Sequence, residues 1–151
     1  MATHVFESHP AACPYQRARE YLHESLEAVV KNHRVMSLAL TAGALEKPVL
    51  VSYKHGADPM RFDEPWLVHW TPEGGGPYPD FDGELTVRAD DSYRRSILEL
   101  RGEYVPPLGV VGQAFDFAVG SRIAAATARA LLQQIAQHME IRYNDEEEAK
   151  K

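Results

Sequence analysis

The sequence predicts an α+β domain in which a curved antiparallel sheet packs against a long C-terminal helix. Between residues 35 and 105, apolar and polar residues alternate with a period of two between Gly and Pro breaks, which is typical of antiparallel strands. Beyond residue 109 the apolar period changes to 3.6, which predicts an amphipathic helix. The chain has 151 residues, of which 44% are hydrophobic and 25% charged, and this composition fits one globular domain.

The first elements are a short strand and a helical segment. Residues 3–7 form the expected strand, which Pro10 and Pro14 end because proline lacks a backbone donor. A helical pattern begins at Tyr15 and reads as one helix, or as two short helices with a break at 23–25. Its apolar positions recur at helical spacing: Ala18, Tyr21, Leu22, Leu26, Val29 and Val30.

Five strands are expected next, at 36–41, 49–54, 66–70, 84–88 and 98–104. The last shows the clearest alternation, because Leu98, Leu100 and Tyr104 share one face with Gly102 while charged residues occupy the other. This pattern predicts a sheet with one buried and one solvated face. The Gly- and Pro-rich segment 73–79 is expected to be a loop.

The final helix follows residues 106–109, with an apolar stripe from Val119 to Met139. Residues 144–151 are polar apart from Ala149, and we expect a disordered tail there. The domain is therefore expected to span residues 1–143. Both the stripe and the apolar sheet face need burial, so the helix is expected to lie across that face.

Charge and cysteine content narrow the class of protein. The formal net charge is -6, which argues against a general nucleic-acid or anionic-membrane binder. One cysteine, Cys13, leaves no internal disulfide and no multi-cysteine zinc site. The sequence shows no secretory leader and no apolar run of membrane-spanning length, so we expect a cytoplasmic protein without an integral membrane segment.

Three local patterns carry a resemblance to a known family: 70–72 (Trp-Thr-Pro), 78–83 (Tyr-Pro-Asp-Phe-Asp-Gly) and 100–109, which runs into the last helix. With the element order, they resemble the helix-grip fold of the START-like (SRPBCC) superfamily, the polyketide cyclase/dehydrase and lipid-transport group, and in particular its small bacterial single-domain members. The resemblance implies a sheet gripping the C-terminal helix around a hydrophobic cavity, and it implies no reaction. Segment 78–83 is expected to be either an ordered turn or a lid.

The candidate cavity wall follows from the apolar sheet face and the helix stripe. The expected ligand-binding residues are Leu38, Leu40, Trp70, Leu98, Leu100 and Tyr104 on the sheet, facing Phe115, Val119, Ile123, Thr127 and Leu131. Tyr104 and Thr127 carry the hydroxyl groups best placed to orient a polar end of a ligand. The alternative is that these side chains pack together as a solid core.

Three functions remain open from the sequence. The first is binding, transport or sequestration of a hydrophobic small molecule, such as a lipid, polyketide or isoprenoid. The second is a cyclase/dehydratase-like enzyme acting on an apolar substrate in the same cavity, which would need an internal acid–base pair; His69 would supply one member only if the strand register were reversed. The third is a partner-binding protein, and a homodimer stays open.

No catalytic residue, metal ligand or cofactor is predicted, so binding is favoured over catalysis. The seven histidines include no His-x-His and no His-x-x-x-His pair. Cys13 is expected to be a small buried side chain rather than a nucleophile, because no accompanying catalytic signature is present.

Overall fold

The structure is a computed structural model, and it describes residues 3–31, 36–42, 45–55, 65–72, 80–92, 94–105 and 117–150. Its elements are β1 (Thr3–Ala11), α1 (Tyr15–Lys31), β2 (Met36–Ala42), β3 (Leu45–His55), β4 (Trp66–Pro72), β5 (Asp80–Ala89), β6 (Ser96–Val105) and α3 (Phe117–Ala149). The expected α+β class and helix-grip architecture are confirmed.

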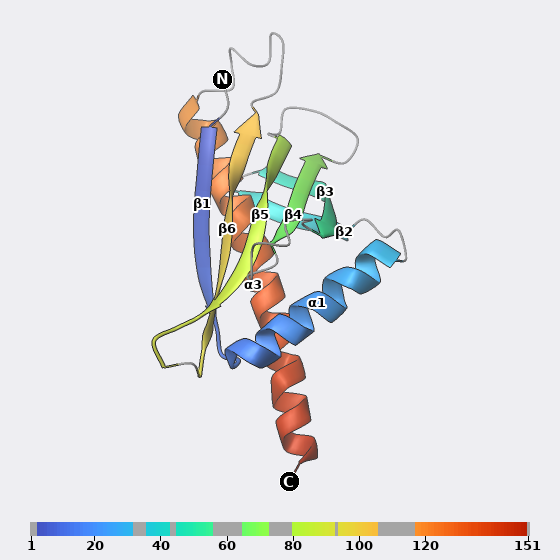
Figure 1. Ribbon diagram of the computed structural model, residues 1–151. Coiled ribbons are helices and arrows are strands. Elements are labelled where there is room, and N and C mark those ends of the chain that lie inside the picture. The colour runs from blue at the N-terminus through green and yellow to red at the C-terminus, as the bar shows by residue number, and fades with distance from the viewer. Residues whose placement is uncertain are drawn as a thin grey trace.

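All strand pairs are antiparallel, in the order β1-β6-β5-β4-β3-β2. The two edge strands, β1 and β2, both contact α3 although four strands separate them in the sheet. The sheet must therefore curve around the helix. Figure 1 shows this twisted sheet with α3 along its inner side and α1 crossing α3 near one end of the sheet.

The inner face of the sheet follows the period-two pattern of the sequence. In β6, Leu98, Leu100 and Tyr104 are fully buried, whereas Arg101 and Glu103 are exposed. In β4, Trp66, Val68 and Trp70 are buried and Leu67 is exposed. The predicted faces of these strands are confirmed. The buried residues of α3 are Ala124, Thr127, Ala128, Leu131, Leu132, Ala136 and Met139.

Two glycines that face each other on β5 and β6 leave space for the ring of Phe81 above the two backbones. Gly83 and Gly102 are register partners. A Cβ built on Gly83 would lie 2.5 Å from the carbonyl oxygen of Arg101 and 2.5 Å from the Phe81 ring. Since real Cβ atoms do not approach other atoms so closely, glycine is required here, and the Phe81 ring fills the space that a side chain would take.

Three features differ from the sequence predictions, and one open alternative is decided. The first strand continues through Pro10, which is tolerated because β1 is an edge strand. The open alternative concerned the first helix, which is continuous, in agreement with the reading of 15–31 as one helix. Residues 80–83 belong to β5 and pair with β4 and β6, so they form neither a turn nor a lid. The expected disordered tail is wrong for residues 144–149, which continue α3, and Glu146 in that segment accepts a hydrogen bond from Tyr21 of α1.

The remaining predictions about connections fall on 73–79 and 106–109, which lie outside the described residues. Among the helices described, none is both long and apolar enough to cross a membrane.

Candidate functional site

A pocket of about 480 Å³ lies where α1 crosses α3, next to β3. This volume is within the range of small-molecule sites in proteins, roughly 300–1,000 Å³. Residues of α1, β3 and the second half of α3 line it: Tyr21, Leu22, Glu24, Ser25, Leu26, Tyr53, Gln134, Ile135, His138, Met139 and Arg142.

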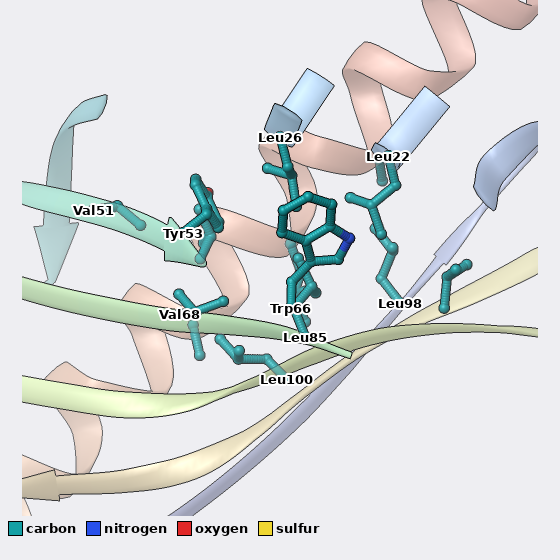
Figure 2. Close-up of a cluster of buried hydrophobic side chains, with 14 of the residues drawn as sticks. Leu22, Leu26, Val51, Tyr53, Trp66, Val68, Leu85, Leu98 and Leu100 are labelled. Carbon is teal, nitrogen blue, oxygen red and sulfur yellow. The ribbon is translucent and has the colours of Figure 1, made fainter. Parts of the chain in front are cut away.

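The floor of the pocket is apolar. Leu22, Leu26 and Met139 are all buried, each with 4% or less of its surface exposed. The two leucines lie four residues apart and so project from the same side of α1. Figure 2 shows both pointing from α1 toward the sheet, with Leu26 above Trp66 and Leu22 above Leu98. A ligand in this pocket would therefore rest against aliphatic side chains.

Tyr53 supplies a polar group from the sheet side. It alternates with Ser52 and Lys54 along β3, so its ring points inward, on the same side of the sheet as the helices (Figure 2). Only 7% of Tyr53 is exposed, and its hydroxyl has no hydrogen-bond partner among the described residues. Burial raises the pKa of Tyr53 far above its usual value of 10.0, so the phenol stays protonated and can donate a hydrogen bond.

The rim of the pocket is polar and joins the two helices. Arg142 of α3 forms an ion pair with Glu24 of α1 at 2.5 Å, and its guanidinium carbon lies 4.9 Å from the Tyr21 ring centroid. The Tyr21 hydroxyl donates a hydrogen bond to Glu146. Burial and this hydrogen bond raise the pKa of Tyr21 to about 12, and the same bond lowers the pKa of Glu146. These contacts fix the crossing of α1 over α3 that forms the pocket.

Comparison with known proteins identifies the fold. No protein-family model matches the sequence, and no curated protein matches it either. Solved structures do match along nearly the whole chain. The ZhuI aromatase/cyclase from Streptomyces sp. R1128 has a TM-score of 0.59 at 16% identity, covering 94% of this chain and 96% of that one. The chain has the START-like fold.

Two further solved structures agree with this START-like fold. Ara h 8.0201 has a TM-score of 0.51 at 10% identity, with 92% of this chain and 98% of that chain covered. TTHA0849 from Thermus thermophilus also has a TM-score of 0.51, at 13% identity, with 91% and 97% covered. At such identities the likeness establishes the fold, and function has to be inferred from the site.

The ligand wall predicted from the sequence lies elsewhere in the START-like domain. Its described members are almost completely buried, and none of them lines the pocket at the helix crossing: Trp70, Leu98, Leu100, Tyr104, Thr127 and Leu131. Leu38 and Leu40 are in β2, and Val119 and Ile123 are in α3, but their side chains are outside the description, as is all of Phe115. The predicted lining therefore stays a prediction.

The sequence patterns do not predict the residues that line this pocket. These residues come from α1, from β3 at Tyr53 and from segment 134–142 of α3. Ile135 and Met139 belong to the predicted apolar stripe of α3, and Leu22 and Leu26 belong to the predicted apolar side of α1. The missing information was where the two stripes cross. Tyr53 alternates with the polar residues Ser52 and Lys54 along the strand. This alternation is the signal that predicts its hydroxyl on the inner side of the sheet.

His69 lies on the outer face of the sheet, so the alternative in which it joins an internal acid–base pair is wrong. Its Nδ1 is 2.7 Å from Oδ1 of Asp82, with side-chain exposures of 45% and 78%. Both line a second, open pocket of about 510 Å³ with Ser52, Lys54 and Glu84. Solvent competes for such exposed groups, so this surface hydrogen bond has a small energetic effect.

Cys13 is completely buried, as expected, and burial raises its thiol pKa to about 11. A thiol with that pKa is a poor nucleophile near neutral pH. Within the part of the chain that the structure describes, no three His, Cys, Asp or Glu side chains gather closely enough to hold a metal ion.

Proposed function

We propose that this START-like domain binds a hydrophobic small molecule in the pocket between α1, α3 and β3. The observation that carries the proposal is the combination of a buried aliphatic floor with a polar rim in a space of about 480 Å³. Binding pockets for small organic molecules have this composition, with apolar walls and a few placed polar groups. Lipids, polyketides and isoprenoids are the ligand classes that suit it.

The two buried tyrosines of the pocket lining favour binding over catalysis. A general acid or base works best with a pKa near the working pH. The two buried tyrosines of the lining, Tyr21 and Tyr53, both have pKa values raised above the usual 10.0. At neutral pH both phenols therefore stay protonated and transfer a proton poorly. Tyr21 already donates to Glu146, whereas Tyr53 can donate a hydrogen bond to a ligand. The fold is shared with an aromatase/cyclase, and that likeness alone assigns no reaction to this chain.

Two adjacent glutamines of α3 provide a matched test. Gln134 lines the pocket and Gln133 does not, and both are exposed. Gln134→Trp should fill pocket volume, whereas Gln133→Trp adds the same ring outside it. Binding is measured by the fluorescence of N-phenyl-1-naphthylamine, a neutral apolar probe.

We expect saturable binding by the wild type, a loss of about tenfold or more in affinity with Gln134→Trp, and a change within about twofold with Gln133→Trp. Thermal unfolding of each variant checks that it is folded. Equal affinities in all three proteins would contradict the proposal, because the probe would then bind outside this pocket.

A further inference from the structure

The hydroxyl groups of the two tyrosines that line the pocket differ in their hydrogen bonding. The hydroxyl of Tyr21 donates to Glu146, so its polar end is satisfied within the fold. The hydroxyl of Tyr53 is buried and has no partner among the described residues. An unmade hydrogen bond in a buried place lowers stability, and most buried polar groups in proteins are paired. The exception at Tyr53 lies in the wall of a ligand-sized pocket, where a bound molecule can supply the partner.

The surroundings restrict what that partner can be. Leu26 lines the pocket together with Tyr53, and the floor is otherwise formed by apolar side chains such as Leu22 and Met139. Arg142 is a cation of the lining, but it is already paired with Glu24 at the rim. An ionised ligand group placed beside Tyr53 would lose its hydration without gaining a counter-ion, which is strongly unfavourable. A neutral acceptor avoids this loss.

We propose that the ligand carries a neutral hydrogen-bond acceptor, such as a ketone or another carbonyl oxygen, which accepts a hydrogen bond from the hydroxyl of Tyr53 while its apolar body lies against Leu22 and Leu26. This inference rests on the proposed function and names the ligand class that the same pocket selects. A carbonyl oxygen suits the position better than a water molecule, because water needs two to four polar partners and the floor supplies few.

The test compares two probes of nearly equal shape. 2-Acetylnaphthalene carries a carbonyl oxygen where 2-isopropylnaphthalene carries a methyl group. Each displaces N-phenyl-1-naphthylamine from the wild type and from Tyr53→Phe, which removes only the hydroxyl. We expect Tyr53→Phe to weaken 2-acetylnaphthalene by about three- to tenfold and to leave 2-isopropylnaphthalene within about twofold.

Two further readouts separate recognition from a structural role. The melting temperature of Tyr53→Phe should equal or exceed that of the wild type, because the substitution removes a buried group that has no partner. The carboxylate 2-naphthoate should bind the wild type at least about tenfold more weakly than 2-acetylnaphthalene, because the carboxylate would be desolvated.

The outcomes distinguish this inference from the proposed function. If Tyr53→Phe changes the affinities of both naphthalenes equally, or of neither, the hydroxyl does not recognise an acceptor and the inference is wrong, while the pocket still binds apolar molecules. Tighter binding of 2-naphthoate than of the ketone, or a clear fall in the melting temperature of Tyr53→Phe, would also overturn it. If neither naphthalene displaces the fluorescent probe from the wild type, the proposed function itself fails.

Discussion

Trp70 and Phe81 stack face to face across β4 and β5. Their ring centroids are 4.0 Å apart, their planes differ by 12°, and both side chains are fully buried. The two residues are register partners, and the Phe81 ring also covers the backbones of Gly83 and Gly102 on β5 and β6. The aromatic stack therefore extends over three neighbouring strands, β4, β5 and β6.

Phe81→Ala should remove this support. Truncating a fully buried phenylalanine costs about 3–5 kcal/mol in the free energy of unfolding, and here the glycine pair beneath the ring would be uncovered as well. Urea unfolding measures the change. Leu67 lies on the outer face and is 40% exposed, so Leu67→Ala is the control and should cost less than about 1 kcal/mol. Equal losses for the two variants would show that the stack contributes no special stability.

Much of the sheet could be predicted because each strand has one buried face. The alternation of Leu98, Leu100 and Tyr104 with charged residues assigns β6 to its correct face, since a shift of one residue would bury the charges. The same holds for Tyr53 between Ser52 and Lys54. The α3 stripe is similarly readable, because helical spacing is local in sequence.

The pocket could not be predicted, because it depends on contacts between distant parts of the chain. Residues 144–149 are polar apart from Ala149, and this composition predicts a disordered tail. In the structure, however, Glu146 accepts a hydrogen bond from Tyr21, and Arg142 pairs with Glu24. These contacts extend α3 past the sheet and set where α1 crosses it (Figure 1). No local pattern in either helix specifies the partner on the other.

The Tyr21–Glu146 hydrogen bond predicts a pH dependence of stability. It holds the pKa of Glu146 below the usual 4.5 in the folded state. A carboxylate with a lowered folded-state pKa stabilises the fold above the unfolded-state value, and this contribution is lost as the pH falls through the folded-state pKa.

Glu146→Gln should therefore melt at a lower temperature than the wild type near neutral pH, and the difference should shrink below about pH 4.5. Thermal unfolding between about pH 3 and pH 8 measures this. Glu147→Gln is the control. The described ion pair of Glu147 joins it to Lys150 at 3.1 Å, and both side chains are largely exposed, so this pair contributes little to stability. A gap for Glu146→Gln that stays constant with pH would mean that the charge of Glu146 contributes nothing.

Cys13 should be unreactive in the folded protein. Its burial, together with the nearby Glu140 carboxylate, raises the thiol pKa from 9.0 to about 11, so the reactive thiolate is scarce at pH 8. An aromatic disulfide reagent should label the native protein very slowly at that pH and label it completely in denaturant. Fast labelling of the native protein would contradict the burial of Cys13 between β1 and α1.

The most direct test of the proposed site is an amide chemical-shift titration of the ¹⁵N-labelled protein with N-phenyl-1-naphthylamine. We predict saturable shifts that cluster in residues 21–26 of α1, at Tyr53 and in residues 134–142 of α3, because these surround the pocket. Shifts confined to the outer sheet face around His69 and Asp82, or shifts that do not saturate, would contradict a hydrophobic binding site at the crossing of α1 and α3.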